Sequence, residues 1–583
     1  MTGALLNLIA IGNQNIILTG NPTKSFFKTK YAKYTNFGLQ KDIVEPVGQT
    51  ELDIQFPTKY RFKIPRYGDL LMDTYLVITL PKIWSPVYKY TQNDLKPEQS
   101  VQSGLPEYRP YEFQWIKNIG TQIIEEVQYS IGGRLIQKYS GSYIQNIVER
   151  DYDANKKELF NIMTGNTKEL TDPANYSNRN NNYPNAFRIG TGTDISSIEP
   201  SIPETQLFIP INSWYSMMST MALPLVCLQY AELEIEFILK PLQSLYTVKE
   251  VLYNFVDNKL KIGSYDDFPR IRPEITSDPK STYGLYRFIQ EPPKRDIDSN
   301  YTYENQLNKI NSKIHLITTQ CFLDNEERIY FANNTQEYLI KIVYEYRENI
   351  KNQSGKFKID SLGLVSSWMW YFQRDDVKDR NEWSNYTNWP YENKFPNTLK
   401  KITDTESVSD IYYPYLSNYV LNDLSKNIYY TGYVPETNMQ QNYKEILKNF
   451  SIIVDGKDRE KELPSGVFSK IENYRASSGI LKDGLYNYNF SLHTDPYRIQ
   501  PSGAFNTNKF KRIEFEYNLT SNPPFDLSSV HFSTICDPET GEIIATSKDP
   551  GSIYKYNYIL HIYEERYNIL RFQSGTADLE YSR

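Results

Sequence analysis

The clearest pattern in the chain is a strict alternation of apolar and polar residues in two widely separated segments. Both Glu232 to Leu239 and Arg512 to Leu519 carry an apolar side chain at every second position, with carboxylates among the residues between. A period of two predicts half-buried antiparallel strands, with one face on a core and the other in water. The apolar positions are Leu233, Ile235, Phe237 and Leu239 in the first segment, and Ile513, Phe515, Tyr517 and Leu519 in the second.

A tight-turn signal precedes each of these strands. Gly132-Gly133 and Asp455-Gly456 each join two strand-like runs. These residue pairs readily adopt the positive φ angles that two-residue hairpins require. Because the hairpin comes before the alternating strand in both parts of the chain, the order predicts two copies of one β unit, and therefore two similar β domains.

Helix signals are few and short. Asp324 with Glu327 resembles an N-cap with an acid at the third helical position, and predicts a helix that runs through Arg328 to Ala332. Ser142 to Arg150 is a second candidate, since Ile144, Ile147 and Val148 share one face. Polar or proline-rich stretches at 90–110, 166–203, 269–300 and 378–442 predict long loops. Many short strands with long loops favour jelly rolls over tight barrels.

An aromatic segment, RNEWSNYTNWPY, runs from Arg380 to Tyr391. It has neither a helix period nor a strand period, so we expect an ordered loop held by aromatic anchors. The anchors are Trp383, Tyr386, Trp389 and Tyr391. Ordered loops of this length usually have a function.

Composition places the chain among globular proteins with real cores. Its 583 residues are 39% apolar and 23% charged, enough for two or more large domains. The net charge of −6 argues against direct nucleic-acid binding, for which a basic chain is expected. The 50 tyrosines fit a tyrosine-rich β core and extensive subunit contacts equally well.

The cysteines and the first residues of the chain indicate the cellular compartment in which the protein is expected to assemble. Cys227, Cys321 and Cys536 are far apart and odd in number, so they predict neither a disulfide framework nor a metal site, and suit assembly in a reducing cytosol. No charge precedes Lys24, so a secretory signal is not predicted. No apolar run approaches the ~20 residues of a membrane span.

Catalytic motifs are missing from the sequence. GxxxxGK[ST], GxGxxG, HExxH and GxSxG do not occur, and we expect no catalytic residue, cofactor or metal site. Asp151, Asp153 and Asn155 begin like a calcium loop, but Lys156 and Ile162 stand where glycine and glutamate are needed, so an exposed polar turn is favoured.

The histidines are scattered and predict ordinary strand and loop positions. A metal or nucleophile pair is conceivable at two of them, but no third ligand is placed. The histidines are His315, His493 near Asp495, His531 near Asp537 and Cys536, and His561.

Basic and aromatic residues interleave near the start of the chain, a mixture that can bind nucleic acid or anionic lipid. The favoured interpretation is an arm that packs beneath its own domain with its lysines at the surface. The residues are Lys24, Phe26, Phe27, Lys28, Lys30, Tyr31, Lys33 and Tyr34.

Asn-x-Ser/Thr triplets are frequent, as expected by chance in an asparagine-rich chain, and we expect them to be unmodified. They start at Asn175, Asn300, Asn333, Asn352, Asn385, Asn449, Asn489 and Asn518.

Short segments along nearly the whole chain resemble, in the same order, the double jelly-roll major capsid proteins of nucleocytoplasmic large DNA viruses, including those of giant viruses. They are Leu18–Pro22, Phe26–Lys28, Tyr34–Phe37, Ala222–Tyr230, Leu323–Ile340, Arg380–Tyr391, Gln500–Asn506 and Tyr567–Gly575. The chain departs from the family pattern at Asn325, Asp578 and Glu580.

The resemblance implies an all-β fold of two tandem eight-stranded antiparallel jelly rolls, with short helices and long loop insertions. The implied domains are an arm at 1–25, a first jelly roll at 26–322 and a second at 323–583. Some of the long insertions would form an outer tower on the shell.

It also implies a partner set. Three chains would form a homotrimer of pseudo-hexagonal outline, and trimers would tile an icosahedral shell beside neighbouring capsomers, minor capsid proteins and pentons. The arm would lie at the inner side of the shell, where contact with an inner membrane is a hypothesis. The chain would be assembled in host cytoplasm and reside in the virion.

Two alternatives remain open from the sequence. A minor capsid or scaffold paralogue would share the fold. A carbohydrate-binding or hydrolytic jelly roll would need clustered acids and aromatics, and the loop at 383–391 could serve as a sugar platform.

Overall fold

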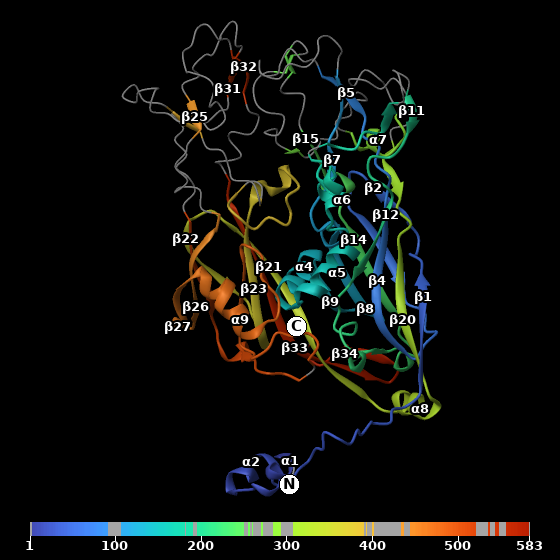
Figure 1. The fold of residues 1–583 in the computed structure, drawn as a ribbon, viewed down its shortest axis with the longest axis vertical. Coiled ribbons are helices and arrows are strands. Elements are labelled where there is room, and N and C mark those ends of the chain that lie inside the picture. The colour runs from blue at the N-terminus through green and yellow to red at the C-terminus, as the bar shows by residue number, and fades with distance from the viewer. Residues whose placement is uncertain are drawn as a thin grey trace.

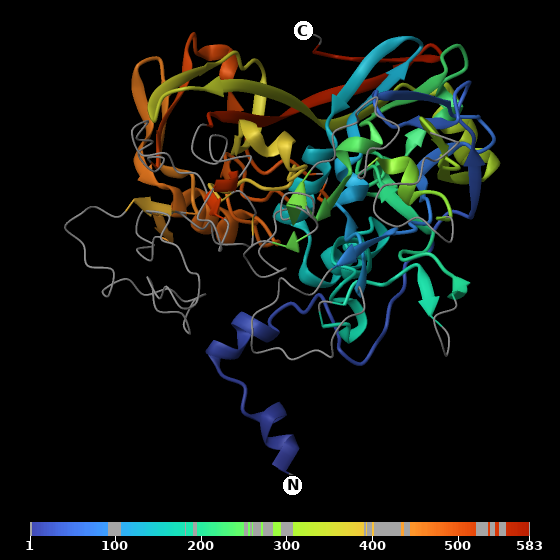
Figure 2. The ribbon, with the colours of Figure 1, turned by 90° about the horizontal axis from the view of Figure 1, so that it is seen from above.

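The computed structural model describes residues 3–90, 107–180, 182–189, 195–249, 255–256, 259–260, 270–271, 284–292, 307–389, 392, 399–401, 433–435, 444–498, 500–520, 534–536, 543–546 and 556–581. Two β units stand side by side, the first drawn in blue to green and the second in yellow to red (Figures 1 and 2). Short helices lie between and below them, so the prediction of an all-β fold with short helices is confirmed.

The first unit contains two main sheets. One has the order β1-β20-β4-β12, with β13 beside β4, and the other has the order β3-β14-β8-β9. Neighbouring strands in both sheets are antiparallel. Their bounds are β1 (Phe37–Val44), β3 (Thr58–Lys63), β4 (Leu70–Leu80), β8 (Ile124–Ile131), β9 (Arg134–Tyr139), β12 (Thr205–Pro210), β13 (Leu223–Pro224), β14 (Leu233–Leu239) and β20 (His315–Leu323).

The second unit repeats this topology strand for strand. Its sheets have the orders β21-β33-β23-β28, with β29 on β23 and β34 on β33, and β22-β30-β26-β27. The predicted duplication is confirmed, whereas the count of eight strands in each unit stays a prediction because short extra strands join the sheets. The bounds are β21 (Gln336–Ile350), β22 (Ser354–Ile359), β23 (Leu364–Arg374), β26 (Leu447–Val454), β27 (Lys457–Pro464), β28 (Leu485–Asn489), β29 (Phe505–Asn506), β30 (Ile513–Leu519), β33 (Tyr558–Gln573) and β34 (Thr576–Leu579).

The two alternating segments and the two hairpins occupy equivalent places. β14 lies between β3 and β8, and β30 lies between β22 and β26; buried and partly buried side chains alternate along β14 and from Phe515 to Leu519 of β30. The hairpins β8–β9 and β26–β27 turn at Gly132-Gly133 and Asp455-Gly456, all four with positive φ. Both predictions are therefore confirmed, and the turn residues are those that left-handed backbone favours.

Both predicted helices form. Asp324 caps α8 by accepting a hydrogen bond from the Asn325 amide, and Ser140 caps α4 through the Tyr143 amide. Asp153 caps a further helix, α5, so the exposed turn predicted around Asp151 to Asn155 is wrong: Asp151 is buried at the end of α4. The α-helices are α1 (Gly3–Ile9), α2 (Ile16–Thr19), α3 (Ile119–Gln122), α4 (Gly141–Asp151), α5 (Ala154–Met163), α6 (Lys168–Thr171), α7 (Leu285–Phe288), α8 (Asn325–Asn333) and α9 (Glu472–Ala476), which continues a π-helical turn, η13 (Val467–Ile471).

Short strands decorate the connections. The predicted loop at 166–203 is wrong in part, because it holds α6 and the hairpin β10–β11. Most of the loops predicted at 90–110, 269–300 and 378–442 lies outside the described residues. The short strands are β2 (Glu51–Asp53), β5 (Val87–Tyr90), β6 (Glu107–Pro110), β7 (Phe113–Trp115), β10 (Phe187–Ile189), β11 (Ile195–Ile198), β15 (Tyr246–Lys249), β16 (Phe255–Val256), β17 (Lys259–Leu260), β18 (Arg270–Ile271), β19 (Lys309–Asn311), β24 (Leu399–Lys401), β25 (Tyr433–Pro435), β31 (Thr534–Cys536) and β32 (Ile543–Thr546).

Candidate functional site

The aromatic segment predicted as an ordered loop is buried between the two units. We call residues 380–389 the aromatic loop; Pro390 and Tyr391 lie outside the described residues. Tyr386 is completely buried, its ring stacked on Tyr371 of β23 with centroids 3.7 Å apart. Its hydroxyl donates a hydrogen bond of 3.1 Å to Asn146 Oδ1 of α4, in the first unit. The predicted order is thus confirmed, and its cause is contact across the molecule.

Polar side chains of the aromatic loop reach backbone carbonyls of the first unit. Asn381 Nδ2 donates to the carbonyls of Gln243 at 2.8 Å and Tyr246 at 2.9 Å. Trp383 Nε1 donates to the Ser244 carbonyl at 2.8 Å. Buried carbonyls need such donors, so the asparagine and tryptophan serve as direct ties between the units.

The aromatic rings of the loop are already covered. Tyr386 has Lys482 Nζ at 3.5 Å from its ring centroid and Tyr371 stacked on it. Trp383 has Lys240 Nζ at 4.6 Å from its ring centroid. A sugar platform needs an exposed ring face. In the hypothesis of carbohydrate binding at 383–391, neither Tyr386 nor the covered side of Trp383 can therefore provide that face.

A buried ionic cluster joins α4 to β33. Arg150 donates to both carboxylate oxygens of Glu565, at 2.9 and 3.2 Å, and to both of Asp151, at 3.0 and 2.8 Å. Tyr143 and Ser367 also donate to Glu565, at 2.9 and 2.6 Å. A buried ion pair is tolerated only when its lone pairs and protons are satisfied in this way.

Burial and the charge of Arg150 determine the pKa values of the two carboxylates in this cluster. Burial by itself would raise the pKa of Glu565, but Arg150, Lys341 and the hydrogen bonds from Arg150 and Ser367 lower it to about 2. Burial raises the pKa of Asp151, although Arg150 and the hydroxyl of Thr494 oppose the rise. Glu565 is therefore the firmly ionised partner of Arg150.

Together these contacts define what we call the seam: α4 with its cap Ser140 on one side, and β21, β33 and the aromatic loop on the other. At its edge, the amide and hydroxyl of Ser140 donate to Glu345 of β21, at 2.7 and 2.9 Å. Figure 1 shows α4 between the two units. Sequence reasoning missed the seam apart from the aromatic loop, because its partners lie up to 422 residues apart.

The candidate histidine pairs do not form in the described part of the chain. His493 is exposed while Asp495 pairs with Arg498. His561 stacks on Tyr371, and burial lowers its pKa to about 3. His531 and Asp537 lie outside the described residues. Among those described, no cluster of three or more His, Cys, Asp or Glu could hold a metal ion, and no helix could span a membrane.

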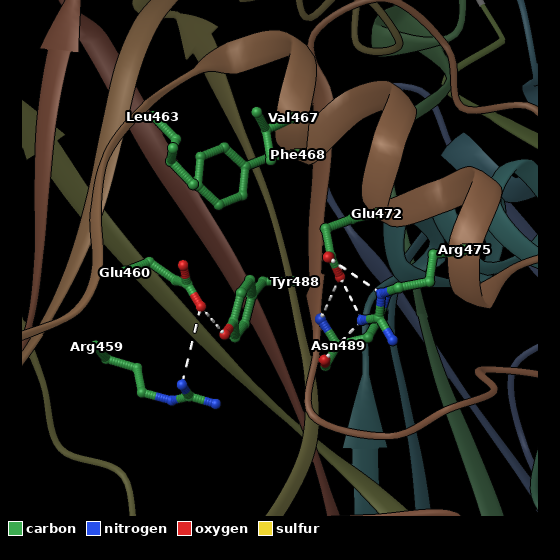
Figure 3. Close-up of a pocket in the computed structure, with 9 residues that line it drawn as sticks. All are labelled: Arg459, Glu460, Leu463, Val467, Phe468, Glu472, Arg475, Tyr488 and Asn489. Carbon is green, nitrogen blue, oxygen red and sulfur yellow. Dashed lines mark hydrogen bonds and ion pairs between the residues drawn. The ribbon is translucent and has the colours of Figure 1, made fainter.

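A polar pocket of about 280 Å³ opens between β27 and the η13–α9 helix (Figure 3). Its charged residues are already paired: Tyr488 donates to Glu460 at 2.7 Å, and Arg475 to Glu472 at 2.7 Å. Both carboxylates of the pocket are therefore held by side chains of the same chain.

Two glycosylation triplets are excluded by burial in the folded chain. Asn385 and Asn489 are 1% and 5% exposed, so their amides are inaccessible to a glycosyltransferase. Asn175, Asn333 and Asn352 are exposed, and Asn300 lies outside the described residues.

The start of the chain does not pack beneath its own unit, so that expectation is wrong. Every residue from 3 to 36, before β1, is exposed, and the segment leads away from the body (Figures 1 and 2). Phe27 is fully exposed and Leu18 is 88% exposed.

Two jelly-roll units joined by a buried seam define a class by its fold: the double jelly-roll proteins. Among solved structures, PBCV-1 VP54 matches with a TM-score of 0.56 at 17% identity, covering 96% of this chain and 100% of that one. The Faustovirus major capsid protein matches with a TM-score of 0.56 at 12% identity, covering 98% and 96%.

Sequence comparison gives the family. Residues 25–262 match the model for the major capsid protein N-terminus, and residues 327–578 match that for the large eukaryotic DNA virus major capsid protein. The major capsid proteins of Phaeocystis pouchetii virus and Paramecium bursaria Chlorella virus 1 are each 24% identical, with both chains covered completely. The chain belongs to the major capsid proteins of nucleocytoplasmic large DNA viruses, and its role is structural, in the capsid shell of the virion.

Proposed function

We propose that the protein works as a homotrimeric capsomer of pseudo-hexagonal outline, and that these trimers tile the faces of an icosahedral shell. The observation that carries the proposal is the duplicated topology: both units have the same strand order in both sheets. Two similar units per chain give six around a threefold axis, which fill a hexagonal lattice with one gene product.

Electron microscopy of the purified full-length protein tests this proposal. We expect particles of three chains with a hexagonal outline, and a mass three times the 68.3 kDa of the chain. A protein that stays monomeric at micromolar concentration would contradict it.

We also propose the finer parts of this function. The domains divide at 25/26 and 322/323; in support, β20 ends at Leu323 and β21 begins at Gln336. The chain performs no catalysis, binds no nucleic acid directly, and is assembled in host cytoplasm. Its shell neighbours are other capsomers, minor capsid proteins and pentons. Abundance in purified virions separates a dominant shell protein from a minor or scaffold paralogue.

The exposed arm is proposed to contact the inner membrane or minor capsid proteins. The support is its exposed apolar residues, among them Leu8 and Leu18, which continue into the exposed lysines and aromatics that follow residue 25. Removing residues 1–25 should leave soluble trimers but impair shell assembly, measured by particle yield. Intact shells from the truncated chain would refute this role.

A further inference from the structure

Each side of the seam has a counterpart elsewhere in the chain that no described residue covers in the way that the seam is covered. The helix α4 follows β9 through Ser140-Gly141, and η13–α9 follows β27 through Ser465-Gly466. The strand pair β21–β33 corresponds to β1–β20 by its place in the sheet order. Within one chain α4 packs on β21–β33, whereas η13–α9 and β1 lie at opposite sides of the molecule (Figure 1).

The helical counterpart exposes apolar side chains. Counted from the shared Ser-Gly step, Ile471 stands at the position of Asn146, which contacts the aromatic loop, and Arg475 stands at the position of Arg150. Ile471 is 60% exposed and Tyr474 93% exposed. Arg475 pairs with Glu472 of its own helix, as Figure 3 shows.

The strand counterpart is also apolar and exposed, and its register identifies the equivalent residues. A shift of register on the neighbouring strand aligns the two sheets: Thr318 and Gln320 pair with Thr74 and Leu71, as Glu564 and Arg566 pair with Trp368 and Val365. In this alignment Lys41, which pairs with Thr319, corresponds to Val343, which pairs with Glu565. By the same register Ile43 corresponds to Glu345, the partner of Ser140 in the seam. Ile43 is 60% exposed.

The residue at the position of Glu565 adds an independent observation. Thr319 is 7% exposed, and its hydroxyl has no hydrogen-bond partner within the described part of the chain. A buried hydroxyl is normally satisfied. In the seam, the equivalent position receives an arginine from the neighbouring helix, and Arg475 is the arginine at the matching place on the other face.

We propose that the η13–α9 face of one copy docks on the β1–β20 face of a second copy, reproducing the seam between chains. The inference rests on the proposed trimer and names its contact surfaces. Ser465 then lies against Ile43 of the second copy, and Arg475 faces its Thr319. Such a head-to-tail contact uses two different patches, so each chain has one of each and a ring can close.

Paired surface variants test the two faces separately. I471D/Y474D blocks the helix face and L39D/I43D blocks the strand face, while I329D/Y330D on α8 is a matched control with similar exposed side chains. Both blocked variants should be monomeric, with trimer dissociation shifted at least 100-fold in concentration, and the control should remain trimeric. An equimolar mixture of the two blocked variants should form a dimer that cannot grow, because one intact contact remains.

An engineered cysteine pair gives a second measurement, disulfide crosslinking, which tests the contact in the assembled trimer. Oxidation of S465C/I43C should yield covalently closed trimers on denaturing gels, and S465C/I329C should not. Blocked variants that still form trimers, or an uncrosslinked S465C/I43C trimer, would overturn the docking geometry while leaving the trimer intact. A wild-type chain that is itself monomeric would instead refute the proposed function.

Discussion

The two units differ in whether their hydrophobic core includes residues of the other unit. The core of the second unit is closed on itself and aromatic: Trp370 stacks on Phe450 with centroids 4.4 Å apart, and Trp368 meets Phe515 edge-on at 4.9 Å. The core of the first unit continues through the seam, because the same apolar cluster includes Val343, Tyr386 and other residues of the second unit.

This difference separates two kinds of stability in one chain. The stability of the core of the second unit depends on close packing and on buried apolar area, and residues of that unit alone supply both. The seam combines apolar contact with a buried ionic cluster, whose members come from both units. Substitutions in the core should therefore weaken one unit, whereas substitutions in the seam should weaken the fixed angle between units.

The largest effect is expected from W370A in the second core. Trp370 is completely buried, and removing a tryptophan side chain from a packed core costs about 3–5 kcal/mol. Guanidinium unfolding followed by near-ultraviolet circular dichroism measures the loss. W389A, at a partly buried position, is the control and should cost much less. Equal losses would show that the core is not closed on itself.

R150M should have the next largest effect and should act on the seam. It leaves Glu565 and Asp151 buried without the arginine that bonds both of them, and removing one partner of a buried pair costs about 3–5 kcal/mol. Adding E565Q should restore part of the loss, since the pair is coupled. Hydrogen exchange should show opening at α4 and β33 and unchanged protection in β26 and β30; exchange rising equally in all four would contradict the comparison.

Which features of the fold and the seam the sequence predicts depends on how far apart the interacting residues lie along the chain. The alternating strands, the hairpins at Gly132-Gly133 and Asp455-Gly456, and both helices follow from local rules, so they were predicted. The local pattern places Asp151 in an exposed turn, because nothing local indicates its contact with Thr494, 343 residues away. Nor does it indicate that the neighbouring Arg150 pairs with Glu565, 415 residues from that arginine. The composition of the aromatic loop predicts that it is ordered. Which unit its side chains contact depends on tertiary packing, which the periodicity of the sequence does not determine.

A pH effect from Glu565 should be smaller and should separate the seam from the core. The pKa of Glu565 in the folded chain lies at about 2, below its ordinary value, so its stabilisation is present above about pH 4.5 and is lost as the pH falls toward 2. The raised pKa of Asp151 works in the opposite direction and reduces the net loss. Unfolding free energies between pH 5 and 2 should fall less steeply for E565Q than for the wild type.

The matched control for this window is E337Q, which removes an exposed carboxylate of β21 that pairs with Arg571. Its pH dependence should follow the wild type, because exposed pairs contribute little. If E565Q and the wild type lose stability in parallel, Glu565 is not the group that titrates.

The smallest effect is expected from Y386F, which keeps the stacked ring and removes one hydroxyl. That hydroxyl donates to Asn146 Oδ1, so the substitution leaves a buried acceptor without its donor and should cost about 1–2 kcal/mol. Y386A should cost more, because it also removes the ring that packs on Tyr371. Y230F, at an exposed tyrosine, should change the free energy of unfolding by less than about 0.5 kcal/mol. If Y386F is as neutral as Y230F, Tyr386 is held by its stacked ring alone, and its hydrogen bond to α4 contributes nothing to the stability of the seam.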